Sequence, residues 1–183
     1  DQVELYYKNV SSGQWVAINT TANASQLYYN WTNIPTAAVS YPSKTQIRIK
    51  TVDDPSVQAT DDSDLFYIYP YIRMDYPNAG GVVWNVTETR QINWTLYGPM
   101  DKAGIWYNNS SGWNLLTPGG GTGISASSGQ WTWSGIGAQY VNENCQLVIA
   151  MYEGNDTAPI QPSDASDNNF SIRGKMSITR PTE

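Results

Sequence analysis

The chain has 183 residues, of which 40% are hydrophobic, so it can bury the core of one or two small domains. It contains no histidine, which excludes serine and cysteine triads, imidazole metal ligands and the usual proton shuttle of neutral-pH enzymes. The net charge of -6 argues against a nucleic-acid partner, and no apolar run approaches the roughly 20 residues of a membrane span.

Short segments with alternating apolar and polar residues follow one another along the chain. They lie at residues 3–7, 45–50, 66–68 and 91–96, and turn-forming residues separate them, as at residues 108–112. A period of two residues is typical of half-buried β-strands, and no stretch has a convincing helical period. The sequence therefore predicts an all-β protein.

The sequence repeats itself at a spacing of about 100 residues. Phe66 and Pro77 each have a counterpart 104 residues later, at Phe170 and Pro181. Further matches are residues 5–9 with 105–109, Trp31 with Trp133, and residues 46–49 with 146–149. Because these matches keep the same order, they predict tandem copies of one structural module.

The repeat sets the expected domain boundaries. Residues 1–69 are expected to form a partial immunoglobulin-like repeat that lacks its first strands, residues 70–174 a complete repeat, and residues 175–183 the first strand of a further repeat. About seven strands in roughly 100 residues are typical of an immunoglobulin-like sandwich. The predicted fold class is therefore all-β, with tandem immunoglobulin-like (fibronectin-like) antiparallel β-sandwich repeats, and the chain is interpreted as a section of a longer array.

The complete copy contains a set of distinctive motifs. They are YPNAGGVVW at residues 76–84, INW at 92–94, Trp113, GQWTW at 129–133, and DASD at 164–167 before Phe170 and Ile172. These motifs resemble the immunoglobulin-like repeat shared with the yeast Kre/Knh cell-wall-synthesis (Ser-Thr-rich GPI-anchored) family, which also occurs in large bacterial and archaeal surface proteins. The chain departs from the family at residues 79–82, where two glycines are more often followed by Glu. The resemblance implies an extracellular, non-catalytic repeat and carries no catalytic residues.

Acceptor motifs for N-glycosylation are the most prominent functional feature. Ten asparagines begin an Asn-X-Ser/Thr motif: Asn9, Asn19, Asn23, Asn30, Asn85, Asn93, Asn108, Asn109, Asn155 and Asn169. Chance pairing of the 16 Asn with the 33 Ser and Thr residues would give only about three. The alternative is that these residue types simply share β-turns. Outward strand positions, as expected for Asn93, favour glycosylation, and glycosylation would place the chain at an extracellular cell surface.

Carboxylates cluster at the same place in both copies. The clusters contain Asp53, Asp54, Asp61, Asp62 and Asp64 in the first copy, and Asp156, Asp164 and Asp167 in the second. Calcium would suit such oxygen ligands, but their spacing matches no known calcium loop. The favoured alternative is that the aspartates cap turns by accepting backbone hydrogen bonds. We therefore expect no metal site and no cofactor.

Aromatic residues are expected to divide between the core and one exposed surface. Trp94 alternates in phase with its apolar neighbours, which predicts burial. Tyr67 and Tyr69 alternate out of phase with theirs and, with Tyr71, form a candidate partner-contact surface near the junction between copies. The alternative is that these tyrosines simply pack at a sheet edge or at the joint between domains. Cys145 is expected to be a buried, inert thiol.

Together these features favour a non-catalytic structural or adhesive surface protein of the kind that forms stalks, sheaths, S-layers or filaments. Its expected partners are copies of itself or neighbouring repeats of a longer chain, with surface polysaccharide as a further candidate. In a sharper form of this hypothesis, residues 175–183 complete the strand-deficient first copy of a neighbouring subunit. The alternative function is a carbohydrate-binding accessory module of a secreted hydrolase.

Overall fold

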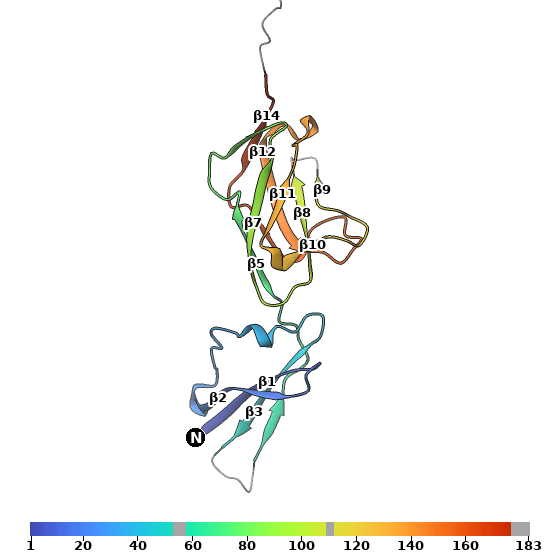
Figure 1. Ribbon diagram of the computed structural model, residues 1–183. Coiled ribbons are helices and arrows are strands. Elements are labelled where there is room, and N and C mark those ends of the chain that lie inside the picture. The colour runs from blue at the N-terminus through green and yellow to red at the C-terminus, as the bar shows by residue number, and fades with distance from the viewer. Residues whose placement is uncertain (53–57, 109–111, 177–183) are drawn as a thin grey trace, which may run out of the picture. The chain divides into compact units, whose positions relative to one another are not determined.

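The computed structural model describes residues 1–52, 58–108 and 112–176, and within these ranges the chain is all-β (Figure 1). The only helices in these ranges are four single-turn 3-10 helices, which confirms the expected absence of α-helix there. None of them has the length and apolar character that crossing a bilayer requires. The contacts divide the chain into two compact units, unit 1 (Asp1–Pro70) and unit 2 (Tyr71–Glu183).

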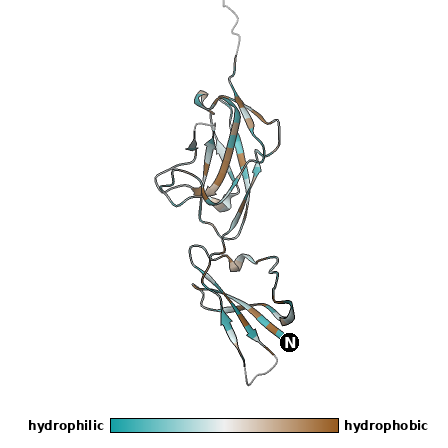
Figure 2. Ribbon diagram, turned by 180° about the vertical axis from the view of Figure 1, so that it is seen from behind, coloured by the Kyte–Doolittle hydropathy of each residue, from teal (hydrophilic) through white to brown (hydrophobic). Residues whose placement is uncertain are grey.

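Unit 1 is built around one antiparallel sheet with the strand order β2-β1-β3-β4. The strands are β1 (Gln2–Asn9), β2 (Trp15–Asn23), β3 (Thr45–Thr51) and β4 (Thr60–Asp62). Apolar and polar residues alternate along β1 (Figure 2), and the strands expected at residues 3–7 and 45–50 are confirmed. The buried residues include Tyr7, whose ring centroid lies 5.2 Å from that of Trp31, and Ala38 and Thr45, which are fully buried.

The strand expected at residues 66–68 does not form. Phe66 makes only an isolated bridge with Thr45. Its counterpart Phe170 begins a strand that is hydrogen-bonded on one side to β12 and on the other to β6. No described segment of unit 1 lies in the place of β6, so Phe66 has one neighbouring strand instead of two. An alternating pattern alone does not make a strand without partners for its backbone groups.

Unit 2 contains two sheets. Its described elements are β5 (Tyr71–Tyr76), β6 (Val83–Asn85), β7 (Arg90–Tyr97), β8 (Lys102–Asn108), β9 (Trp113–Leu115), β10 (Ile124–Ser125), β11 (Gln130–Trp133), β12 (Asn142–Met151), β13 (Ile160–Ala165) and β14 (Phe170–Arg173). One sheet has the order β11-β7-β5 and the other β10-β8-β12-β14-β6, with β13 paired to β12 and β9 to β8. The described strands number ten rather than about seven, and they pair in the expected antiparallel way except for β6, which pairs with β14 in parallel.

Aromatic side chains fill the core of unit 2. Trp84 is completely buried, with its ring centroid 4.6 Å from that of Phe170 and 6.1 Å from that of Trp133. Trp94 is also buried, as its phase in the sequence predicts. Large aromatic rings remove much apolar surface from water and therefore dominate the stability of such a core. The result is a β-sandwich-like, all-β unit.

The central strand pairs of the two units share one register. Leu5 in β1 lies opposite Ile49 in β3, and Ile105 in β8 lies opposite Ile149 in β12. The neighbouring pairs follow the same pattern, from Val3–Thr51 with Ala103–Met151 to Lys8–Gln46 with Asn108–Gln146. The two sheets therefore have equivalent positions that can be compared residue by residue.

In both units a serine that precedes the final segment makes the same pair of hydrogen bonds to the central strand, β3 or β12. Ser63 Oγ accepts a hydrogen bond from the backbone N–H of Ile47 at 3.0 Å, and Ser166 Oγ accepts one from Leu147 at 3.4 Å. The backbone N–H groups of Ser63 and Ser166 donate in return to the carbonyls of Ile47 and Leu147, at 2.8 and 2.9 Å. These paired bonds fix the entry to the final segment of each unit.

Candidate functional site

Three glycosylation motifs of unit 1 form tight turns around the asparagine side chain. The Oδ1 atoms of Asn9, Asn19 and Asn23 each accept a hydrogen bond from the backbone N–H two residues later, at 3.1, 2.8 and 2.9 Å. Each Oδ1 also accepts from the hydroxyl of that same residue. These contacts are the Asx-turns that the turn interpretation of the motifs predicts. They also leave Asn23 exposed at the end of β2.

Asn85 is held by a neighbouring carboxylate. Its Nδ2 and backbone N–H donate to the two carboxylate oxygens of Glu88, each at 2.9 Å, and Arg90 donates to Glu88 at 2.7 Å. These donors, the Asn85 side chain foremost, lower the pKa of Glu88 to about 2. The Nδ2 atom of Asn85, to which a glycan would be attached, is therefore already hydrogen-bonded within the protein.

Asn93 is more enclosed than its sequence position suggests. It lies on β7, the central strand of the sheet β11-β7-β5, and its side chain is half-buried. Its Oδ1 atom is buried, and no described group donates a hydrogen bond to it. An outward direction on a strand does not make a side chain accessible when strands flank it on both sides.

The remaining acceptors lie at more open positions. Asn30, Asn155 and Asn169 are exposed, whereas Asn108 is half-buried. Asn108 and Asn169 line a shallow groove of about 150 Å³ with two further amide side chains, Asn144 and Gln146. Asn109 lies outside the described residues. The structure therefore separates exposed acceptors from enclosed ones, a distinction that the motif alone does not contain.

Tyr67 and Tyr69 belong to a cluster of three tyrosines. Both are exposed by about two fifths, and their rings lie 5.6 and 4.9 Å from the ring of Tyr41, centroid to centroid. The ammonium group of Lys44 lies 5.5 Å from the Tyr67 ring. Tyr41 was not among the predicted residues, because it comes from an irregular segment with no periodic pattern. The cluster offers a partly apolar surface with a nearby positive charge.

Tyr71, the third residue of the predicted contact surface, does not belong to this cluster. It is the first residue of unit 2, at the start of β5, and its ring stacks on Tyr97 of β7 at 5.6 Å. The pair is exposed on its own sheet. The structure thus brings two of the three predicted tyrosines together and places the third in a different pairing.

The aspartates accept hydrogen bonds individually. The carboxylates of Asp156, Asp164 and Asp167 accept from the backbone N–H groups of Glu153 and Met74 and from the side chain of Asn78, respectively. Across residues 1–52, 58–108 and 112–176, no three His, Cys, Asp or Glu side chains are placed to share a metal ion. Asp53 and Asp54 lie outside the described residues. Only the bond to Asp156 is a local turn cap, because Asp164 and Asp167 bind groups 90 and 89 residues away in the sequence.

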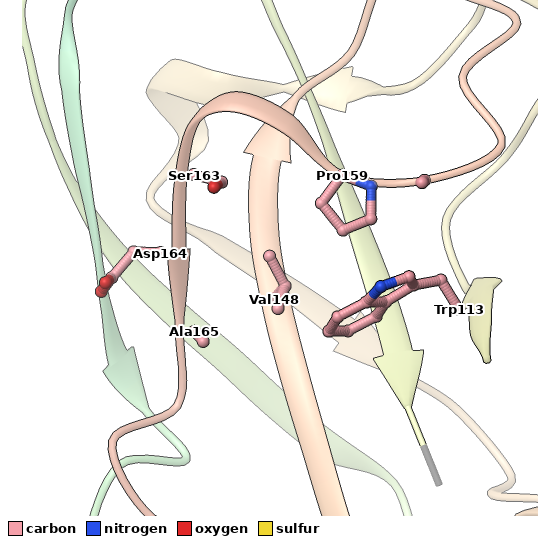
Figure 3. A pocket seen from close by; sticks show the side chains of 7 residues that line it. Trp113, Val148, Pro159, Ser163, Asp164 and Ala165 are labelled. Carbon is pink, nitrogen blue, oxygen red and sulfur yellow. The ribbon is translucent and has the colours of Figure 1, made fainter. Parts of the chain in front are cut away.

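An open groove of about 380 Å³ runs beside Trp113 in unit 2 (Figure 3). The indole ring of Trp113 stands on β9 next to Val148 of β12 and Pro159. The other lining residues are Ala158, Ser163, Asp164 and Ala165. The Asp164 carboxylate accepts the backbone N–H of Met74 at 2.8 Å. The groove therefore presents one partly exposed aromatic ring and few charges.

The equivalent ring in unit 1 is covered by charged groups. Trp15 faces Lys8 across β1 and β2, as Trp113 faces Asn108 across β8 and β9. The Lys8 ammonium lies 4.5 Å from the Trp15 ring centroid, and the Arg48 guanidinium lies 4.1 Å from it. Two cations thus occupy the face of Trp15 through cation–π contacts.

A substitution between the units explains this difference. Arg48 is held over the ring by two hydrogen bonds to Asp62, at 2.6 and 2.8 Å. The residues at the matching register positions of unit 2 are Val148 and Ala165, which have no charge. The charged groups that cover Trp15 therefore have no counterpart at Trp113, whose ring lines an open groove.

No protein-family model matches this chain, and neither a curated protein nor a solved structure matches it. The resemblance to the Kre/Knh repeat therefore rests on the sequence motifs alone. The function must be argued from the geometry described above.

Proposed function

We propose that this chain is part of a non-catalytic, extracellular surface protein built from tandem, N-glycosylated immunoglobulin-like repeats. Such a protein would serve as a stalk, sheath, S-layer or filament component, with copies of itself or neighbouring repeats as its partners. The observation that carries the proposal is the shared register of the two units. Leu5 pairs with Ile49 as Ile105 pairs with Ile149, and the serine-closed turns match as well.

Tandem repeats suit a structural role because each unit can add length without adding chemistry. The chain contains no histidine, and Asp156 and Asp164 each accept a hydrogen bond from a backbone N–H group. The ten acceptor motifs support an extracellular route, and Asn23, Asn30, Asn155 and Asn169 lie at exposed positions where an attached glycan meets solvent.

Glycopeptide mass mapping of the protein purified from its native source tests this proposal. We expect added hexose-type mass on peptides that contain Asn23, Asn30, Asn155 or Asn169. The enclosed Asn93 provides the internal comparison, and its peptide should carry little or no added mass. Unmodified peptides at all four exposed asparagines would overturn the glycoprotein proposal.

A second candidate function is carbohydrate binding, which the open Trp113 groove favours. A flat indole ring in a groove of 380 Å³ can stack against the C–H face of a sugar ring. Titration with soluble cell-wall polysaccharides, followed by tryptophan fluorescence, tests this candidate. Binding should be lost in Trp113→Ala and retained in Trp15→Ala, because cations already cover the Trp15 ring. A response that survives Trp113→Ala would reject the groove as the site.

A further inference from the structure

Two grooves of unit 2 lie on the same face of the sheet that contains β8 and β12. One is the groove beside Trp113 (Figure 3), and the other is the shallow groove of about 150 Å³ that four amide side chains line. Along β12, Val148 belongs to the first groove, and Gln146 and Asn144 belong to the second. Because alternate residues of a strand point to the same face, the two grooves follow each other along this strand.

The strand register joins the two grooves across the sheet as well. Asn108 of β8 lies opposite Trp113 of β9 on one side and opposite Gln146 of β12 on the other. Side chains of directly opposed residues share a face and lie about 5 Å apart. The aromatic ring is therefore followed by a row of amides, which we call the amide strip: Asn108, Asn144, Gln146 and Asn169.

The amide strip presents neutral hydrogen-bonding groups. Each side-chain amide has N–H donors and a carbonyl acceptor. Asn144 and Asn169 are exposed, and no group in the described part of the chain is hydrogen-bonded to their side-chain amides. Gln146 is held in place by its Nε2 atom, which donates to the carbonyl of Ser166 at 3.4 Å. Donors and acceptors that lie side by side match sugar hydroxyls, because a hydroxyl both donates and accepts.

The charge of this face indicates which class of sugar it fits. Among the described residues that line the two grooves, Asp164 is the only charged one. Its carboxylate already accepts a hydrogen bond from the backbone N–H of Met74. An anionic sugar such as a uronate would therefore meet no cation among these lining residues, whereas an uncharged sugar needs none.

Unit 1 differs from unit 2 in charge on the matching face. At three of the corresponding positions, 100 residues earlier, the side chain is positively charged: Lys8, Lys44 and Arg48. Their counterparts in unit 2 are Asn108, Asn144 and Val148, which are neutral. The same register thus carries a cationic face in one unit and a neutral face with a partly exposed indole in the other.

We propose that Trp113 and the amide strip form one binding site for a neutral polysaccharide, with one sugar ring stacked on the indole and further rings hydrogen-bonded along the strip. This inference rests on the second candidate function, carbohydrate binding, and adds the class of sugar and the residues that bind it beyond the stacked ring. From Asn144 to Val148 the site runs about 13 Å along β12, because each residue of a strand advances by roughly 3.3 Å. It therefore accommodates more than one linked ring.

The test measures affinity by calorimetry on the full chain. Asn108 and Asn169 also begin glycosylation motifs, so the chain is produced in a host that attaches no N-glycans. The probes are cellohexaose, chitohexaose and mannohexaose, the corresponding single sugars, and hexagalacturonic acid as the anionic probe. We expect a neutral hexasaccharide to bind about tenfold more tightly than its single sugar, because the additional rings make additional hydrogen bonds, and hexagalacturonic acid not to bind.

Variants of the amide strip show whether it takes part in binding. Gln146→Ala should weaken binding of the hexasaccharide about fivefold, the effect of losing one neutral hydrogen bond, and Asn144→Ala should do the same. The matched control is Gln46→Ala, because Gln46 makes the same hydrogen bond to a serine carbonyl in unit 1. This control should leave the affinity unchanged.

A double variant tests the open, neutral character of the groove. Val148→Arg with Ala165→Asp transfers to unit 2 the pair that covers Trp15 in unit 1, where Arg48 is held by Asp62. Binding of the hexasaccharide should be lost while the circular dichroism spectrum stays native. If the double variant does not fold, the single amide variants decide the question, because they change side chains on the outer face.

Four results would overturn the inference. Binding that is lost in Trp113→Ala but unchanged in Gln146→Ala and Asn144→Ala would retain carbohydrate binding and reject the amide strip. Tighter binding of hexagalacturonic acid than of every neutral probe would reject the class of sugar. Dimers in sedimentation that Trp113→Ala dissociates would assign the face to a second copy of the chain. Absence of binding to every probe would reject this inference and the second candidate function together, and would leave the proposed structural role untouched.

Discussion

The Sγ atom of Cys145 lies 3.3 Å from the hydroxyl oxygen of Tyr107 in the interior of unit 2. Sγ also lies 3.2 Å from the backbone carbonyl of Asn142, and the Cys145 side chain is completely buried, as the sequence predicts. Burial raises the pKa of this thiol, and the hydrogen bond with Tyr107 offsets part of the increase. The thiol is therefore held in its protonated, weakly nucleophilic form.

We predict that Cys145 reacts with thiol reagents only when unit 2 opens. Ellman's reagent at pH 8 should label less than one thiol per chain over hours in buffer, and one thiol per chain at once in denaturant. The labelling rate should not depend on reagent concentration once opening is limiting. Rapid labelling of a chain with a native circular dichroism spectrum would contradict the burial of this residue.

Alanine variants of the matched residues Ile49 and Ile149 test whether Ile49 is exposed to solvent. Ile149→Ala should lower the free energy of unfolding of unit 2 by about 2 to 5 kcal/mol, because it creates a cavity in a filled core. Ile49→Ala should lower that of unit 1 by less than about 1 kcal/mol, because its side chain is partly in water already. Chemical denaturation of both variants checks this difference, and equal losses would show that Ile49 is covered in solution.

Glu88 should make the stability of unit 2 fall at low pH. Its folded-state pKa of about 2 lies below the value of about 4.3 expected in the unfolded chain. The contribution of this carboxylate is therefore present above pH 4.3 and is lost as the pH falls towards 2. Glu88→Gln should flatten the fall in melting temperature across this window. An identical acid profile in the variant would assign the pH dependence to other carboxylates.

Gly135 and Gly123 of unit 2 both have a positive φ, so a comparison of their alanine variants distinguishes the cost of backbone strain from the cost of a steric clash. Gly135, with φ 61°, has open space where a Cβ would lie, so Gly135→Ala should cost only about 1 to 2 kcal/mol for its left-handed backbone. Gly123, with φ 53°, would place a Cβ 2.7 Å from the Tyr152 ring and 3.1 Å from the carbonyl of Ala103. Gly123→Ala should cost about 1 to 3 kcal/mol more. Thermal unfolding of both variants checks the difference, and equal melting temperatures would show that the contact relaxes freely.

The sequence predicts the strands of this protein well where the pattern is local. The alternation around Leu5 and Trp94 identifies both the strands and the inward side, because a two-residue period is a property of each strand alone, whereas around Ile49 it identifies the strand but not the burial. The repeat adds the pairing, since equivalent residues take equivalent registers. Phe66 shows the limit of this reasoning, because its strand depends on a neighbour that its own pattern does not specify.

The candidate sites were less predictable, because they depend on contacts between distant segments. Tyr41 joins Tyr67 and Tyr69 from an irregular stretch without a periodic signal. The groove at Trp113 is open because Val148 replaces the arginine that covers the matching ring in unit 1. Only a position-by-position comparison of the two copies could have indicated it. Likewise, the enclosure of Asn93 follows from the strands on either side and not from its motif.

The pairing of β14 has a mechanical consequence. This strand, Phe170–Arg173, is held by antiparallel bonds to β12 on one side and parallel bonds to β6 on the other. A pull on the segment that leaves Arg173 acts along β14, so it loads both ladders in shear and stretches their bonds together rather than peeling them one by one. The strand is thereby suited to resist a pull along its own axis.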